Sequence, residues 1–199
     1  MLVVQPIALR RSQWGVTMLE VLVTLVILAF GLLGLAGLNA RIQTSELEAY
    51  QRARAILLLR DMVERVKANS ADAASYVPPS DATNKIYGTD YTVPTDCATS
   101  QAVRDICEWS NALTGAAESS SGTRVGAMIG ARGCIEQIQA PNTDDGVCTP
   151  GIYRATVVWQ GLTATGASQL KCGAGKYGTD DAMRRAISSD IVVGLPLCV

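Results

Sequence analysis

The feature that most constrains this chain is an uncharged apolar run, Val21–Leu38, which lies close to the N-terminus. A helix needs about 20 such residues to cross the hydrocarbon core of a bilayer, so the run predicts a membrane-spanning helix. Glu20 stands directly before the run. A carboxylate at the edge of a membrane segment is costly unless a cation or water compensates its charge, so Glu20 requires an explanation.

The sequence after the run predicts that the same helix continues to about residue 69. Apolar residues recur there at spacings of three and four, which favours one apolar stripe: Ala49, Ala53, Ile56, Leu57, Val63 and Val66. Other positions are charged and include two favourable i,i+4 pairs, Glu48–Arg52 and Asp61–Arg65. No proline interrupts residues 16–76. A helix over 16–69 would be about 80 Å long, with its second half packed under a globular head. The alternative is a helical hairpin, for which Asn39 is the strongest turn signal.

All six cysteines follow the apolar run, at Cys97, Cys107, Cys134, Cys148, Cys172 and Cys198. None belongs to a Cys-x-x-Cys pair and the chain has no histidine, so the spacing is unlike that of zinc sites. We expect disulfides formed in an oxidising compartment; buried free thiols in a cytosolic protein are the alternative. Pairing of neighbours (97–107, 134–148 and 172–198) would close the shortest loops. Arg10 and Arg11 precede the run and favour a cytoplasmic N-terminus, although Arg41 on the other side weakens the asymmetry.

The remainder of the chain predicts a mixed head. Glycine and proline concentrate after residue 77. A short helix is expected within 96–117, with one apolar side: Val103, Ile106, Trp109 and Leu113. Strands are expected at 133–140, 152–160 and 184–193, and the alternation is clearest in the second. The predicted fold class is α+β: a long N-terminal helix, and a small C-terminal antiparallel sheet packed on its second half, with disulfide-stapled loops.

Several kinds of chemistry are excluded by composition. Without histidine there can be no Ser-His-Asp or Cys-His site, and Gly173-Ala174-Gly175-Lys176 lacks the spacing of a phosphate-binding loop. A net charge of −1 offers no general basic surface for nucleic acid. Acidic pairs at Asp144-Asp145 and Asp180-Asp181 are more typical of solvated turns than of a calcium site. We therefore expect no catalytic residue, no metal and no cofactor.

Residues 15–20, Gly-Val-Thr-Met-Leu-Glu, resemble the type IV prepilin signature: Gly, then Phe or Met, Thr, Leu, an aliphatic residue and Glu. Val16 departs from that pattern. The resemblance implies that prepilin peptidase cuts after Gly15 and that the new amine of Val16 is methylated. It also implies that Glu20 pairs with the N-terminal amine of a neighbouring subunit, whereas a solvated Glu20 at the headgroup level is the alternative. The expected divisions are a cleaved leader (1–15), a membrane and filament-core half-helix (16–38), an amphipathic half-helix (39–69) and a globular head (70–199).

Shorter patches in the C-terminal half resemble the PilV class of minor pilins, which is related to the I-type minor pseudopilins of type II secretion. They are Gly133-Cys134-Ile135, Tyr153 leading to Val158-Trp159-Gln160-Gly161, and Arg184-Arg185. This resemblance implies a structural, non-enzymatic subunit that helps to prime type IV pilus assembly in a tip complex and supports twitching motility. It would contact other minor pilins and the major pilin through N-terminal helices. It would be held in the inner membrane, with a periplasmic head, before reaching the pilus. A minor pseudopilin and a membrane-tethered binding module or enzyme are the alternatives.

Overall fold

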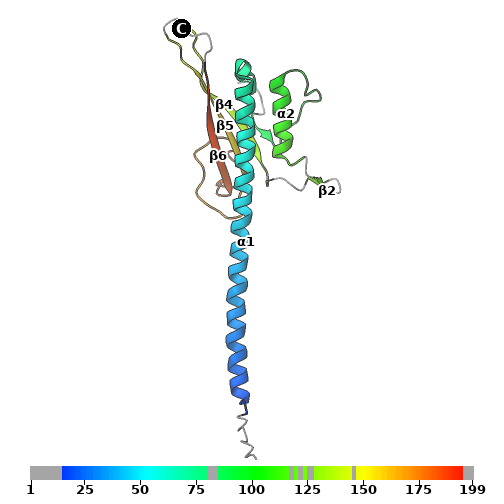
Figure 1. Ribbon diagram of the computed structural model, residues 1–199, viewed down its shortest axis with the longest axis vertical. Coiled ribbons are helices and arrows are strands. Elements are labelled where there is room, and N and C mark those ends of the chain that lie inside the picture. The colour runs from blue at the N-terminus through cyan, green and yellow to red at the C-terminus, as the bar shows by residue number, and fades with distance from the viewer. Residues whose placement is uncertain are drawn as a thin grey trace, which may run out of the picture. The chain divides into compact units, whose positions relative to one another are not determined.

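The computed structural model describes residues 15–79, 85–116, 128–144 and 147–194, together with the backbone of 119–120 and 123–124. The leader up to residue 14, Asp145 and Cys198 lie outside the described residues. The chain divides into two compact units, Met1–Ser45 and Glu46–Val199. Helix α1, Met18–Ala68, belongs to both, so the predicted uninterrupted helix is confirmed and the hairpin is wrong (Figure 1).

The N-terminal segment of α1, residues 18–45, contains no buried side chain. Its most apolar window has a mean hydropathy of 2.7 and is 0% buried, and α1 is the one helix in the described ranges long and apolar enough to cross a membrane. The hydroxyls here are satisfied within the helix: Thr24 donates to the Val21 carbonyl at 2.8 Å and Thr44 to the Ala40 carbonyl at 3.0 Å. Such back-bonding satisfies the hydroxyl donor of each threonine within the helix.

The second unit is an α+β head, as predicted. After α1 come the 3-10 helix η1 (Ser70–Tyr76), strand β1 (Tyr87–Gly88), helix α2 (Gln101–Leu113), strands β2 (Ser119–Ser120) and β3 (Thr123–Arg124), and strands β4 (Arg132–Gln139), β5 (Gly151–Gln160) and β6 (Arg184–Val193). The main sheet is antiparallel in the order β1-β4-β5-β6, and β2 pairs with β3 separately. The expected short helix and three strands are therefore confirmed. Strands β1 to β3 were not predicted, because two residues are too few to show alternation.

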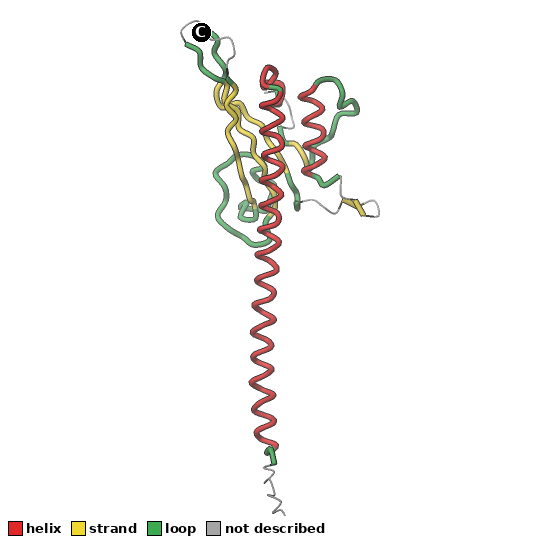
Figure 2. Tube along the Cα trace, viewed as in Figure 1, coloured by secondary structure: helices red, strands yellow, loops and turns green. Residues whose placement is uncertain are grey.

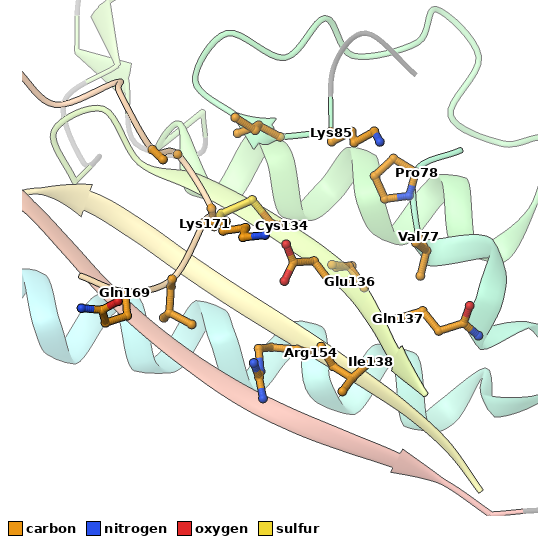
Figure 3. Close-up of a pocket in the computed structure, with 16 residues that line it drawn as sticks. Val77, Pro78, Lys85, Cys134, Glu136, Gln137, Ile138, Arg154, Gln169 and Lys171 are labelled. Atoms are coloured by element: carbon orange, nitrogen blue, oxygen red, sulfur yellow. A yellow bond between two sulfur atoms is a disulfide. The ribbon is translucent and has the colours of Figure 1, made fainter. Parts of the chain in front are cut away.

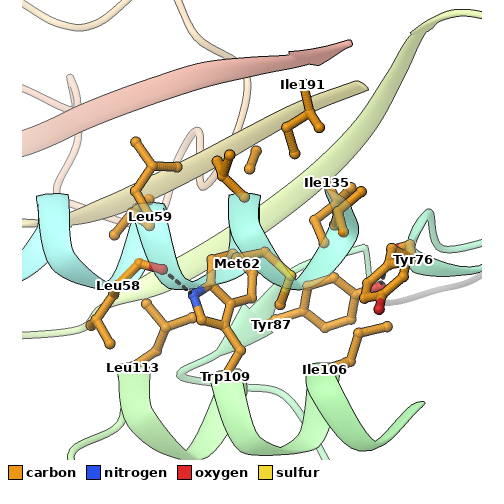
Figure 4. Close-up of a cluster of buried hydrophobic side chains, with 14 of the residues drawn as sticks. Leu58, Leu59, Met62, Tyr76, Tyr87, Ile106, Trp109, Leu113, Ile135 and Ile191 are labelled. Carbon is orange, nitrogen blue, oxygen red and sulfur yellow. Dashed lines mark hydrogen bonds between the residues drawn. The ribbon is translucent and has the colours of Figure 1, made fainter. Parts of the chain in front are cut away.

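The core of the head lies where the head segment of α1 (residues 46–68) meets α2 and the inner face of the sheet (Figure 4). Trp109 of α2 is fully buried, and its indole Nε1 donates to the Leu58 carbonyl of α1 at 2.9 Å. The ring also fills the space over Gly133 of β4, where an added Cβ would come within 2.1 Å of it. Glycine at this position is therefore a packing requirement.

The predicted stripe on α1 is partly wrong. Val63 and Val66 are buried, but Ala49, Ala53 and Leu57 are exposed and Ile56 is half-buried. The residues that pack on the sheet and on α2 are Ala55, Leu58, Leu59, Met62, Val63 and Val66. Apolar residues occur on more than one side of this helix, and spacing alone cannot say which side the rest of the chain will cover.

The outer face of the sheet is also covered, over its central part. Val158 and Thr156 point away from the main core, yet both are buried, because the long loop 161–183 crosses that face (Figure 2). Val158 packs there with Tyr177 and the Cys134–Cys172 disulfide. The simple inward–outward alternation expected of β5 therefore holds only near its ends.

Two disulfides are described. Cys97–Cys107 confirms the expected neighbour pair, but Cys134–Cys172 contradicts both of the others, 134–148 and 172–198. Shortest-loop reasoning fails because the fold brings the loop back over β4, which places the Cα atoms of Cys134 and Cys172 5.9 Å apart. Cys148 is also disulfide-bonded.

Candidate functional site

The start of α1 has a defined geometry. Gly15, Val16 and Thr17 are not helical, and the helix begins at Met18. The carbonyl of Thr17 accepts hydrogen bonds from the amides of Glu20 (3.1 Å) and Val21 (3.2 Å), and its hydroxyl oxygen Oγ1 accepts from the Glu20 amide at 3.3 Å. Thr17 is thus the N-cap of α1. Gly15 and Val16, the residues expected to flank the cleavage site, lie just upstream in an accessible segment where Val16 is 68% exposed.

Glu20 lies in the first helical turn and is exposed. A carboxylate is favoured in this position, since the amides at a helix N-terminus carry partial positive charge. Among residues 15–79, 85–116, 128–144 and 147–194, no lysine or arginine forms an ion pair with it. Within the described chain, Glu20 is therefore held by the helix terminus and not by a cation.

The head segment of α1 carries a second apolar stripe that the head does not cover. Leu47, Tyr50 and Leu57 follow spacings of three and seven and are 55%, 60% and 60% exposed. Leu57 is directly followed by the buried Leu58, so the two stripes lie on different sides of one helix. Sequence reasoning assigned Leu57 to the buried stripe and did not identify Leu47 or Tyr50. The exposed stripe of Leu47, Tyr50 and Leu57 is a candidate contact surface.

Glu48 of α1 binds the end of the sheet where β5 ends and β6 begins. Its Oε1 accepts hydrogen bonds from the amides of Leu162 (3.0 Å) and Thr163 (3.1 Å) and from the Thr163 hydroxyl (2.9 Å), and Arg185 donates to it at 3.2 Å. The sequence had paired Glu48 with Arg52, its neighbour on the helix. The loop after β5 and the start of β6 provide the partners instead, and no local sequence signal indicates them.

Arg65 joins α1 to α2 at the other end of the head. Its guanidinium contacts Asp61 (2.9 Å), as predicted, and also Asp105 (3.0 Å) and Glu108 (2.6 Å) of α2. Tyr76 donates to Asp105 at 2.5 Å. Burial, followed by the hydrogen bond to Asp105, raises the pKa of Tyr76 to about 12. The cluster is internally compensated and holds the two helices together.

The loop over the outer face is organised by Asp181 and Arg184. Asp181 accepts from the amides of Gly175 (2.7 Å) and Tyr177 (3.2 Å), and these bonds, together with the nearby Arg184, hold the pKa of its carboxyl below the usual range. The buried Arg184 donates to the carbonyls of Ser168, Leu170 and Cys172. The carboxylates of Asp180 and Asp181 therefore stabilise the turn by accepting hydrogen bonds from its backbone amides.

A cleft of about 930 Å³ lies beside the Cys134–Cys172 disulfide, between β4 and residues 169–174 (Figure 3). Its charged lining residues are Lys85, Glu136, Arg154 and Lys171. Arg154 is already bound to Asp190 through two hydrogen bonds of 2.7 and 3.1 Å. The lining contains no nucleophile adjacent to a base, and no group of three or more metal-ligating side chains occurs in the described part of the chain. The cleft does not have the composition of an active site.

Comparison with known sequence families gives two adjoining matches. Residues 10–36 match the prokaryotic N-terminal methylation motif, and residues 37–112 match the type IV pilin Tt1218 family. No curated protein and no solved structure matches the chain.

The first match includes Gly15, Val16 and Glu20, and the second includes the head segment of α1 and all of α2 except its last residue, Leu113. The methylation motif implies processing by prepilin peptidase. Proteins of the pilin family are structural and are generally not enzymes. The chain is therefore a protein of the type IV pilin family that carries the prepilin N-methylation motif.

Proposed function

We propose that this protein is a minor pilin, a structural subunit that helps to initiate type IV pilus assembly. The observation that carries this proposal is the division of α1: its N-terminal segment is apolar and 0% buried, whereas its head segment provides the core of a folded head. An apolar helix segment that no other described residue covers needs a bilayer or other helices around it. A pilin has the bilayer before assembly and neighbouring helices afterwards. The minor, priming role and the place in a tip complex rest on the resemblance to the PilV class.

Processing at Gly15 and Val16 is part of the proposal. Before processing, the N-terminal segment would lie in the inner membrane with the head in the periplasm, an oxidising compartment in which the disulfides of the head are stable. Cleavage after Gly15 creates a cationic amine at Val16, four residues before Glu20 in the chain. In the assembled fibre, Glu20 would face the amine of a neighbouring subunit, because a carboxylate in an apolar bundle requires a compensating cation.

The intact mass of the full chain, coexpressed with a prepilin peptidase, tests this proposal. We expect the mature product to begin at Val16 and to carry one added methyl group. Coexpression with a catalytically inactive peptidase is the control and should leave Met1 in place. If Met1 is retained with the active enzyme, the pilin proposal fails and a membrane-tethered binding module becomes the better description.

The role of Glu20 is tested by Glu20→Gln, with Glu46→Gln as a matched control on an exposed part of the same helix. We expect Glu20→Gln to be cleaved but to enter sheared fibres much less than the wild type, and Glu46→Gln to behave normally. Normal incorporation of Glu20→Gln would support the alternative in which Glu20 is only solvated.

A minor pseudopilin of a type II secretion system is the second candidate, because the class that the C-terminal patches resemble is related to such subunits. Deletion of the gene separates the two functions. Loss of surface fibres and of twitching supports the minor pilin, whereas loss of protein export with fibres intact supports the pseudopilin.

A further inference from the structure

The cap of α1 lies beside the proposed cleavage site. Thr17 ends the non-helical segment, and its hydroxyl oxygen accepts a hydrogen bond from the amide of Glu20, three residues further on. The spacing Thr17-x-x-Glu20 is that of a capping box, in which a threonine at the N-cap is followed by a glutamate at the third helical position. The threonine of the prepilin signature therefore also caps the helix, through the backbone amide of the signature's glutamate.

We propose that Thr17 is a positioning residue for processing: it starts α1 at Met18 and so keeps the Gly15–Val16 peptide bond out of the helix. This inference rests on the proposed processing at that bond. If the helix began at Val16, the Gly15 carbonyl would accept a helical hydrogen bond and the Gly15–Val16 bond would lie in the helix start, whereas a bond upstream of the cap keeps this carbonyl free for an enzyme.

The surroundings of the bond agree with this role. Gly15 has no neighbouring atom within 4 Å of an added Cβ, and Val16 is exposed, so nothing within the described chain covers the segment. Without the threonine hydroxyl, the amide of Glu20 loses its side-chain acceptor, and the preference for starting the helix at Met18 weakens. The upstream residues Val16 and Thr17 would then enter the helix more often.

The test compares initial cleavage rates of full-length variants in membranes with prepilin peptidase. Thr17→Val keeps the shape of the side chain but removes the acceptor, and we expect cleavage to slow by about five-fold, the usual effect of losing an N-cap. Thr17→Ser and Thr17→Asn keep a capping acceptor and should be cleaved within about two-fold of the wild type. The matched control is Thr24→Val, which removes a hydroxyl bonded within the helix and should leave the rate unchanged.

Two results would overturn the proposal. One is cleavage of Thr17→Val at the wild-type rate. The other is a Thr17→Asn variant as slow as Thr17→Val, which would mean that the enzyme reads the threonine side chain directly. The wild-type reaction keeps this test separate from the proposed function: absence of any cleavage in the wild type contradicts the processing itself, whereas a wild type that is cut leaves only the role of Thr17 to be decided.

Hydrogen exchange provides a readout of the helix start that is independent of the enzyme. In the uncleaved chain, the amide of Glu20 should exchange faster in Thr17→Val than in the wild type and should be protected again in Thr17→Asn. Unchanged protection of this amide in Thr17→Val would contradict the capping role even if the cleavage rate fell.

Discussion

The two parts of α1 contain similar apolar residues with opposite environments. Leu33 in the N-terminal segment is 72% exposed, whereas Leu58 and Leu59 in the head segment are 8% and 6% exposed. The hydrophobic core of the head consists of residues of the head itself. Within the described residues, the apolar surface of the N-terminal segment stays uncovered, and it would gain free energy by contact with a bilayer or with other helices.

The same contrast occurs between adjacent residues within the head segment. Leu57 is 60% exposed and Leu58 is 8% exposed, because the sheet and α2 cover only one side of the helix. Local helix propensity is nearly the same for the two leucines, so substitutions at these positions separate the stability of the head from its contacts with partners.

The largest effect is expected for Trp109, the buried aromatic residue of the head, and Phe30 of the N-terminal segment is its control. Trp109→Ala should lower the free energy of unfolding of the head by about 3–5 kcal/mol, since it leaves a large cavity and removes the hydrogen bond to the Leu58 carbonyl. Phe30→Ala, at a residue 70% exposed, should leave the head unchanged. Denaturant unfolding of the full chain in detergent micelles, followed by near-ultraviolet circular dichroism, measures both. Equal effects would remove the distinction between the two units.

The disulfide that closes the longer loop should stabilise the head more, since the stabilisation grows with the logarithm of loop length. Replacing Cys134 and Cys172 together by alanine should cost about 3–4 kcal/mol, and replacing Cys97 and Cys107 about 2–3 kcal/mol, because the sequence separations are 38 and 10 residues. The same unfolding experiment measures the difference. A smaller cost for the 134–172 pair would mean that the loop over the outer face contributes little.

The adjacent leucines of α1 provide a sharper test. Leu58→Ala should destabilise the head by about 2–3 kcal/mol, whereas Leu57→Ala should change it by less than about 0.5 kcal/mol. In fibre incorporation the proposed function predicts a loss for Leu57→Ala despite its normal stability. A normal yield of Leu57→Ala in sheared fibres would show that the exposed stripe is not a contact surface.

The smallest effect is expected from the pH dependence of Asp181. Its pKa is lowered in the folded protein, so its contribution to stability is present above the unfolded pKa and is lost as pH falls through the folded value. Between about pH 5 and pH 2, the denaturation midpoint of the wild type should therefore fall more than that of Asp181→Asn. Parallel pH profiles of the two proteins would contradict the lowered pKa.

The sequence was sufficient to predict the elements that have strong periodicity or unusual length. The apolar run and the absence of proline predicted α1, and alternation in residues 152–160 predicted β5. The features that it could not predict depend on contacts between distant segments. The choice between Leu57 and Leu58 is made by the sheet and α2, and the partner of Cys134 is brought into place by a loop whose course is not encoded locally.

In the candidate site, too, some features could be predicted from the sequence and others could not. Gly15, Val16 and Glu20 were identified because the signature is a contiguous motif. The capping bond from Glu20 to Thr17 could have been predicted from the Thr-x-x-Glu spacing, which is a recognised start signal for helices. The contact between Glu48 and Arg185 could not, since their 137-residue separation leaves no local pattern.

The mass of the protein recovered from sheared surface fibres tests the central claim most directly. If the N-terminal segment of α1 is an assembly helix, the fibre fraction should contain the chain beginning at methylated Val16, with its head disulfides oxidised. Recovery of the protein only from the membrane fraction, with Met1 still present, would contradict the account.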